Sequence, residues 1–344
     1  MNERLLKYAR YVNVVSYPLF YIACLLIFAS LTFPYSKLRD HVVASFNAQQ
    51  RATGGQQELQ IDQMSGYWLS GVRMKGVRLF IDSGESGQPP QKIEVDSVTV
   101  RYGILSSLFG SSDMSFDVMA LGGEASGSYG THGKDLALEV TIDGMDVGRF
   151  EPLVGILGVP LQGKLGGAVK LAMPDGRASK GSGSVSLEVK DTAVGDGKAK
   201  FKGALALPPI NVGTITLAAE AKDGTLKITK FVAGGKDVDL QGEGRIVMRE
   251  LATDSLSDAQ VRFKINDAYR AKNDVTRSLF GAPGSSAPPL IELADPRVKQ
   301  SKRADGFYVW TIRGTIARPE LLPAGGGGAV GAGPPIMMVP PGAP

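Results

Sequence analysis

Cysteine and histidine are almost absent from this chain of 344 residues, which has one cysteine, Cys24, and two histidines, His41 and His132. A single cysteine cannot form a disulfide within the chain, so packing and hydrogen bonds must hold the folded part together. Zinc sites are usually built from clustered cysteine and histidine side chains, and neither histidine has a second imidazole or thiol near it in sequence. A site of carboxylates alone would suit Ca²⁺ better, and residues 143–146 are the candidate loop, but a turn at a strand end explains them better. We predict no metal site and no cofactor.

Motifs for catalysis and nucleotide binding are also missing. No Gly-x-Ser-x-Gly sequence stands between an expected strand and a helix, and the glycine-rich pieces 122–127 and 163–167 precede no helix that could hold phosphate. The 38 basic and 34 acidic residues are mixed along the chain, without a dense basic patch interleaved with aromatic residues, so nucleic-acid binding is not expected. We predict that the protein is not an enzyme. An exported hydrolase with paired carboxylates stays open as an alternative, because such pairs meet only in the fold.

The chain has only one long apolar run, and it lies near the N-terminus. Residues 12–33 read VNVVSYPLFYIACLLIFASLTF and contain no charged side chain. At about 1.5 Å per residue, a helix of this length spans the hydrocarbon core of a bilayer, which is about 30 Å thick. A cleaved signal peptide and a buried core helix are the alternatives. The apolar region of a signal peptide is usually about 7–15 residues long, and a small-residue cleavage site follows it. Here Phe33-Pro34-Tyr35 ends the run, so we predict a single N-terminal transmembrane helix.

Basic residues flank this run and predict its orientation. They are Arg4, Lys7 and Arg10 before the run, and Lys37 and Arg39 after it. Because the side richer in basic residues usually stays in the cytoplasm, residues 1–11 are expected to be cytoplasmic. The bulk of the chain would then lie outside the cytoplasm, which in a bacterium means the periplasm.

After the apolar run, the pattern changes from a helical period to alternation. Leu38, Val42 and Phe46 recur at four-residue steps, which predicts a short amphipathic helix within a juxtamembrane segment, residues 34–56. From residue 57 to about 320, apolar and polar residues alternate, as they do in 136–142, and Asp-Gly turns separate the runs. We therefore predict a mainly β fold, in which an elongated, curved, mostly antiparallel sheet of about a dozen strands has one apolar face.

Two segments interrupt or follow the predicted sheet. Apolar residues at helical spacing predict short helices, one of them over 268–280. Residues 321–344 are rich in glycine and proline and are expected to form a disordered tail.

Two stretches carry a resemblance to a known family. Residues 65–79 read SGYWLSGVRMKGVRL, and residues 157–163 read LGVPLQG. Their order along the chain resembles type II secretion system protein N, over about residues 10–318. The residues that carry the resemblance are Trp68, Gly71, Gly158, Pro160, Leu161 and Gly163. From the residues alone, Trp68 is expected to be a core aromatic that anchors the first strands, with a functional contact as the alternative. Pro160 and Gly163 are expected to shape the start of a strand.

The resemblance implies a non-catalytic protein of the bacterial inner membrane with one membrane pass and a periplasmic β-domain. Such a protein would assist assembly or bridging of the secretion machinery, with subunits of the secretion platform or the secretin as partners. This family is in turn similar to the AsmA-like proteins, whose curved sheets have an apolar groove that is associated with lipid handling. The alternative function is therefore a lipid-binding or lipid-transfer module with phospholipid in such a groove.

Overall fold

The protein is mainly β, with one large antiparallel sheet and a few short helices. The computed structural model describes residues 16–18, 20–22, 24–25, 27–28, 31–52, 55, 57–68, 70–81, 91–103, 111–153, 159–197, 200–201, 205–206, 208–250, 254–285, 287–316 and 318–324. Within these residues the sheet has 14 strands in the order β1 to β8 and then β11 to β16, so each strand pairs with the next one of the sheet along the chain. This confirms the predicted mainly β, antiparallel fold.

The strands are long for a globular protein, and most of them contain ten to thirteen residues. They are β1 (Gln57–Tyr67), β2 (Gly71–Ile81), β3 (Gln91–Tyr102), β4 (Ser111–Ala120), β5 (Gly123–His132), β6 (Asp135–Asp146), β7 (Leu161–Met173), β8 (Ser182–Val194), β11 (Ile210–Lys222), β12 (Thr225–Gly234), β13 (Val238–Val247), β14 (Leu256–Ile265), β15 (Tyr308–Thr315) and β16 (Arg318–Pro323). A separate small pair, β9 (Lys200–Phe201) and β10 (Leu205–Ala206), lies in the connection between β8 and β11.

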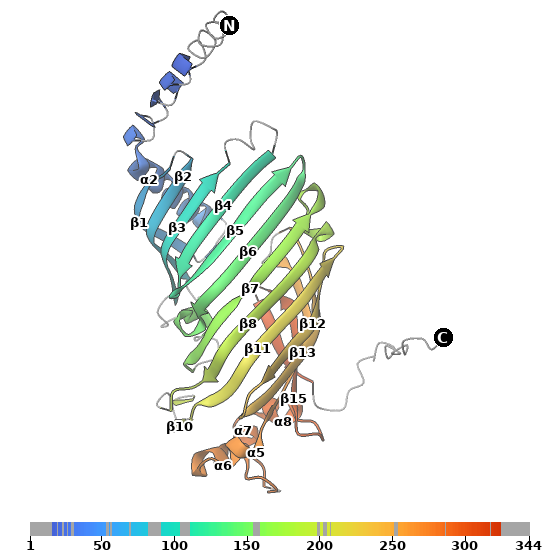
Figure 1. Ribbon diagram of the computed structural model, residues 1–344. Helices are drawn as coiled ribbons and strands as arrows, with labels where there is room; N and C mark the ends of the chain where they lie inside the picture. The colour runs from blue at the N-terminus through green and yellow to red at the C-terminus, as the bar shows by residue number, and fades with distance from the viewer. Residues whose placement is uncertain are drawn as a thin grey trace, which may run out of the picture.

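The helices lie at the two ends of the sheet. They are α2 (Tyr35–Ala52), α5 (Asp267–Arg270), α6 (Asp274–Phe280), α7 (Leu290–Ala294) and α8 (Pro296–Ser301), with short 3₁₀ turns at Val147–Arg149, Pro174–Gly176 and Ala178–Lys180. Figure 1 shows α2 beside β1, and α5 to α8 together at the opposite end. The strands stack between these ends, and the sheet curves so that β12, β13 and β15 turn behind the strands in front.

The first edge of the sheet is covered by α2. Leu59 N in β1 donates to Asn47 Oδ1 (2.8 Å), and Asn47 Nδ2 donates back to Leu59 O (3.2 Å). Arg39 Nη1 also donates to the carbonyl of Asp62 in the same strand (2.9 Å). An uncovered edge strand offers unpaired backbone groups to other chains, so these bonds protect β1 from edge-to-edge pairing.

Among the described residues, the cluster of buried apolar side chains lies at the C-terminal end of the sheet. Its fully buried members come from the ends of strands and from the helices packed over them: Val212, Ala233, Val238, Ile265, Tyr269, Leu279 and Phe280. Tyr269 has no exposed surface, and its hydroxyl donates to Pro208 O (2.6 Å). This cluster closes one end of the sheet and leaves the strands between the ends as a single layer.

The predicted helix over 268–280 is two helices, α5 and α6, in the structure. Asn273 has an extended backbone and begins α6 with a capping box, in which its Oδ1 accepts from Thr276 N (2.8 Å) and its N–H donates to Thr276 Oγ1 (3.0 Å). These local bonds compete with helix continuation, which is why the chain turns at this residue. At the other edge, β16 extends to Pro323, three residues past the predicted end of the sheet.

The N-terminal apolar run is only partly described. Residues 12–15, 19, 23, 26, 29 and 30 of the predicted span 12–33 lie outside the described residues, and its described residues from 16 to 32 are helical. Among all described residues, no helix combines the length and the apolarity that crossing a bilayer requires.

Candidate functional site

One face of the sheet carries an unbroken apolar row. Directly paired residues in neighbouring antiparallel strands place their side chains on the same face. Following the pairing from β1 to β16 connects one residue of each of the 14 strands, and every one is apolar: Gly66, Val72, Val100, Phe116, Gly127, Val140, Val169, Val185, Ala219, Ile228, Gly244, Ala259, Ile312 and Leu321. We call the face that bears this row the inner face.

A second apolar row runs beside the first, two residues further along each strand. It includes Val98, Val118, Ala125, Ile142, Gly167, Leu187 and Leu217. Since neighbouring strands are about 4.8 Å apart, thirteen steps from β1 to β16 give the inner face a contour of about 60 Å. The apolar surface is therefore a continuous band rather than a set of separate patches.

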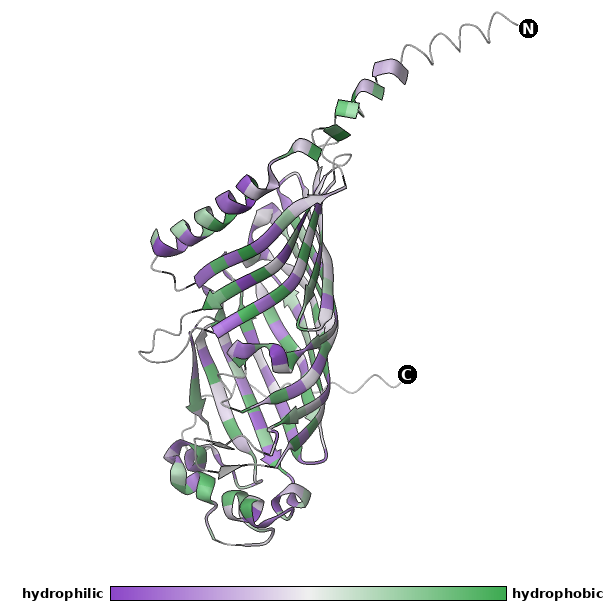
Figure 2. Ribbon diagram, turned by 90° about the vertical axis from the view of Figure 1, so that its left-hand side faces the viewer, coloured by the Kyte–Doolittle hydropathy of each residue, from purple (hydrophilic) through white to green (hydrophobic). Residues whose placement is uncertain are grey.

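The opposite face is polar and carries paired charges. One row there reads Glu139, Lys170, Ser184, Glu220, Lys227, Arg245, Asp258, Arg313 and Glu320. Lys170 pairs with Glu139 (3.4 Å), and Asp258 pairs with both Arg245 (3.6 Å) and Arg313 (3.5 Å). Figure 2 shows the resulting alternation of hydrophobic and hydrophilic residues along the strands. We call this the outer face; its residues suit contact with water or with a polar partner.

The apolar side chains of the inner face are only half-buried in the middle of the sheet. Val140, Val169, Val185 and Ile228 all keep part of their surface exposed, in contrast to the closed core at the C-terminal end. Among the described elements, these strands make their main contacts with neighbouring strands of the same sheet and with the short 3₁₀ turns at strand ends. Exposed apolar area costs about 25 cal/mol per Å², and large contiguous patches of it usually mark an interaction site.

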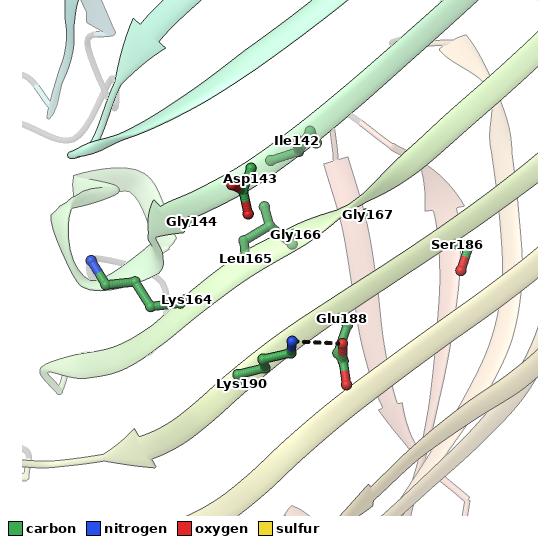
Figure 3. Close-up of a pocket in the computed structure, with 10 residues that line it drawn as sticks. All are labelled: Ile142, Asp143, Gly144, Lys164, Leu165, Gly166, Gly167, Ser186, Glu188 and Lys190. Carbon is green, nitrogen blue, oxygen red and sulfur yellow. Dashed lines mark ion pairs between the residues drawn. The ribbon is translucent and has the colours of Figure 1, made fainter.

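A hollow of about 290 Å³ lies at a defect in the pairing of β6 and β7 (Figure 3). The register shifts there between Ile142 and Met145, and Gly144 and Gly166 contribute no side chains. The lysines around the hollow already have carboxylate partners: Lys190 pairs with Glu188 (3.6 Å) and Lys164 with Asp146 (3.3 Å). The charges of these two lysines are therefore compensated within the chain.

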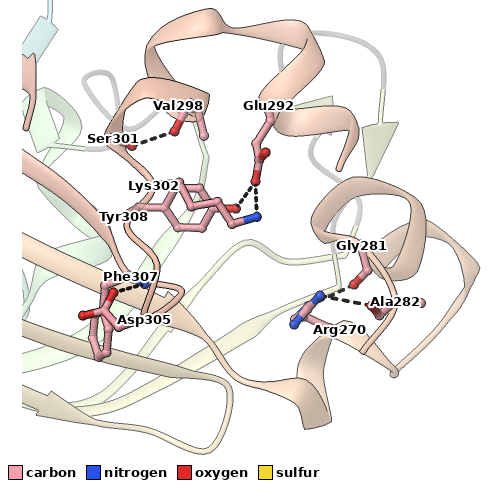
Figure 4. A network of polar contacts seen from close by, with 10 residues as sticks. All are labelled: Arg270, Gly281, Ala282, Glu292, Val298, Ser301, Lys302, Asp305, Phe307 and Tyr308. Atoms are coloured by element: carbon pink, nitrogen blue, oxygen red, sulfur yellow. Dashed lines mark hydrogen bonds and ion pairs between the residues drawn. The ribbon is translucent and has the colours of Figure 1, made fainter. Parts of the chain in front are cut away.

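A polar network holds the helices at the C-terminal end (Figure 4). Glu292 of α7 is 6% exposed, and its Oε1 accepts hydrogen bonds from Lys302 Nζ (2.6 Å) and from the hydroxyl of Tyr308 (2.8 Å). The Tyr308 ring stacks on Phe263, with ring centroids 5.4 Å apart. Every buried polar atom of Glu292 and Tyr308 has a partner. The network therefore has a structural role: it holds α7 against β15.

Burial gives the two tyrosines of this end a pH-dependent effect on stability. Burial, and then the hydrogen bond to Glu292, raises the pKa of Tyr308, and burial, with a smaller effect of Asp237, raises that of Tyr269. Since the folded-state pKa lies above the unfolded value of about 10, their contribution is complete below pH 10 and is lost as pH rises further, by about 1.4 kcal/mol per pH unit for each tyrosine.

We therefore expect the free energy of unfolding of the full chain in mild detergent to fall between about pH 10 and 12. The fall should be shallower in the double variant Tyr269→Phe, Tyr308→Phe, because phenylalanine cannot ionise. Denaturant titrations at several pH values measure both slopes. Parallel curves for the parent and the variant would contradict this explanation.

The flanking and motif residues that the structure describes do not converge on one site. Arg4, Lys7, Arg10 and Gly158 lie outside the described residues. Lys37 and Arg39 lie in the first turns of α2, where Arg39 bonds to β1. Leu161 begins β7, paired with Val194, and the carbonyl of Pro160 accepts from Gly195 N (2.7 Å).

The motif glycines stand where a side chain would collide. A Cβ on Gly71 would lie 2.6 Å from Tyr67 O and 2.9 Å from Val100 O. Gly163 has φ +148 at a register shift between β7 and β8, and a Cβ there would lie 2.8 Å from Val189. These residues serve the geometry of strand starts and hairpins.

The prediction that Trp68 is a core aromatic is wrong. Trp68 lies in the turn between β1 and β2, and its side chain is 80% exposed. Its backbone has φ +54, because the turn reverses the chain at this residue. The turn thus points the ring outward instead of packing it on the sheet.

Chemistry-bearing clusters are not apparent in the described part of the chain. Its His, Cys, Asp and Glu residues form no group of three or more that could hold a metal ion. The sequence does not predict that the apolar row is continuous. Alternation shows that a strand has two different faces, but it does not show how the residues of one strand align with those of the next.

Comparisons with known proteins add no assignment: no protein-family model, curated protein or solved structure matches this chain.

Proposed function

We propose that this protein is anchored in a membrane by its N-terminus and holds phospholipid acyl chains against the inner face of its sheet. The observation that carries the proposal is the apolar row through all 14 strands, which stays half-exposed where the sheet is a single layer. Acyl chains are flexible and non-directional ligands, and each buried CH₂ gains about 0.8 kcal/mol. A long smooth apolar band with no converging polar groups suits such a ligand better than a small polar substrate.

The N-terminal run supports the membrane part of the proposal. Its described residues project large apolar side chains that nothing in the described chain covers, including Phe28 at 65% and Leu31 at 79% exposure. Water is a poor environment for such a helix, and a bilayer removes that cost. With residues 1–11 in the cytoplasm, the sheet would lie in the periplasm of a bacterium, next to the outer leaflet of the inner membrane.

Mass spectrometry of the intact, membrane-extracted protein under native conditions tests lipid binding. After detergent exchange, we expect masses shifted by one or more phospholipids that survive mild collisional activation. A chain of bare mass, extracted under conditions in which a known lipid-binding protein keeps its lipid, would contradict the proposal.

A second candidate is a non-catalytic subunit of the type II secretion machinery, which assists its assembly or bridging. The resemblance motifs favour it, and Gly71 and Gly163 occupy positions where only glycine fits, as expected for motif residues that shape the strands. The outer face, polar and rich in paired charges, is the surface we assign to protein partners. Cross-linking in intact cells followed by purification of the tagged chain should recover platform subunits or the secretin. Recovery of neither would count against this candidate and would leave lipid binding untouched.

A further inference from the structure

The turn between β1 and β2 carries a tryptophan, Trp68, whose exposure and backbone conformation are both unfavourable. The Trp68 ring is 80% exposed to water, and its backbone is in the left-handed region, φ +54, which bulky residues rarely adopt. Such a residue is typical of a surface that binds something outside the chain.

This turn lies next to the point where the N-terminal run joins the folded part. The ring of Tyr35, the first residue of α2, occupies the space in which a side chain on Gly66 would sit. Gly66 directly precedes Tyr67 at the end of β1. Tyr35 in turn contacts Phe33, with ring centroids 4.9 Å apart. Figure 1 shows the β1–β2 end of the sheet beside the start of α2, where the N-terminal segment leaves it.

Cationic groups surround the same turn. The Arg73 guanidinium lies 4.3 Å from the centre of the Tyr67 ring, and Arg101 lies 5.8 Å from it. Arg101 also pairs with Asp117 (3.0 Å), whereas Arg73 donates to the hydroxyl of Thr99 (3.2 Å) and keeps its charge unneutralised by that bond. Exposed Lys37 adds a further cation on α2.

The strand next to this turn adds another interfacial side chain. Tyr102 N, at the end of β3, donates to Ser70 O in the turn (3.1 Å), and the Tyr102 side chain is 39% exposed. Tryptophan and tyrosine with nearby arginine form the combination that lies at the headgroup level of membranes, because the rings tolerate the interface and the cations attract anionic lipids. We define the docking tip as Tyr67, Trp68, Arg73, Arg101 and Tyr102.

We propose that the docking tip binds the lipid headgroup region of the same bilayer that holds residues 12–33, with the Trp68 ring inserted among the headgroups. This inference rests on the proposed membrane anchoring and goes beyond it. A single helix lets the sheet rotate about the helix axis, whereas a second attachment beside it fixes the direction in which the inner face opens. The tip therefore sets the orientation of the sheet against the membrane.

Tryptophan fluorescence of the full chain in vesicles tests the proposal, since the chain has only two tryptophans, Trp68 and Trp310. The vesicles contain phosphatidylcholine and phosphatidylglycerol with bromine on the acyl chains near the headgroups. In the variant Trp310→Phe, bromine should quench the emission of Trp68 to about half and shift it to shorter wavelength, as for an interfacial ring. Adding Arg73→Glu and Arg101→Glu should reduce that quenching.

The variant Trp68→Phe separates this inference from the proposed function, because Trp310 lies on the inner face, paired with Val261. Chains that float with the vesicles but show unquenched Trp68 would overturn the docking tip, and the surface would then bind a protein. Quenched Trp68 with unquenched Trp310 would support the tip and count against lipid on the inner face near β15. Chains that fail to float would overturn both the anchor and the tip.

Discussion

Replacing Val169 with aspartate is expected to abolish co-purification of phospholipid. Val169 lies in β7 in the middle of the apolar row, directly between Val140 and Val185, and it is half-buried. An acyl chain that covers this position would have to strip water from an unpaired carboxylate, at a cost of at least about 3 kcal/mol. Since 1.4 kcal/mol corresponds to a tenfold change, the affinity should fall at least about a hundredfold.

The neighbouring residue provides a matched control. Ala168 is adjacent on the same strand but faces outward, in a row with Thr141 and Ser186. Ala168→Asp introduces the same charge into β7 on the polar face and should leave bound lipid unchanged. Native mass spectrometry counts the lipids in the three proteins, and circular dichroism with thermal unfolding checks that both variants fold. Equal lipid content in folded Val169→Asp and Ala168→Asp would remove the inner face as the binding surface.

The two variants should differ because the alternation of side chains along a strand places polar residues on one face and apolar residues on the other. In a two-layer protein the apolar rows of one sheet meet those of another layer, and the side chains become fully buried. Here the large side chains of the row in β6 to β8, Val140, Val169 and Val185, remain half-exposed, whereas the cluster of buried apolar residues lies near α5 to α8. The fold therefore completes its core at one end and leaves the rest of the apolar face for a ligand.

Local pattern predicts much of this fold, because alternation and turn chemistry are local properties. The run 136–142 predicts the strand β6, and the Asp-Gly pair at 223–224 predicts the hairpin between β11 and β12. Register is not local. The shifts between Gln162 and Lys164, and between Ile228 and Val232, decide which residues face each other, and alternation within one strand does not give this pairing. The continuous row could thus be recognised only from the paired strands.

The wrong prediction for Trp68 and the polar network that no sequence pattern indicates have the same origin. Tryptophan is a residue type that is often buried, yet the turn that reverses the chain at Trp68 directs its side chain outward. Glu292, Lys302 and Tyr308 are each unremarkable in sequence, and they meet because α7, α8 and β15 fold together at the C-terminal end. Residue type predicts the preferred environment of a side chain, whereas connectivity decides which environment it reaches.

Placing two arginines in the N-terminal run is expected to move the protein from the membrane to the soluble fraction. The double variant Leu25→Arg, Phe28→Arg changes two described, exposed helical positions of the run. Each arginine near the centre of a membrane helix costs about 2.5–3.5 kcal/mol, so the pair costs about 5–7 kcal/mol. That cost should prevent stable insertion of a run that has no second apolar segment of similar length to support it.

The same two charges on α2 test whether position, rather than charge, causes this loss. Val42 and Ser45 are also exposed and three residues apart, so Val42→Arg with Ser45→Arg adds the same charge outside the run. We expect this control to stay in the membrane pellet through an alkaline carbonate wash, while the double variant in the run is released. Intact mass of the membrane-bound parent should include residues 1–33, because an anchor is retained whereas a signal peptide is removed. A parent that lacks these residues, or a run variant that resists the wash as the control does, would show that something other than residues 12–33 holds the chain at the membrane.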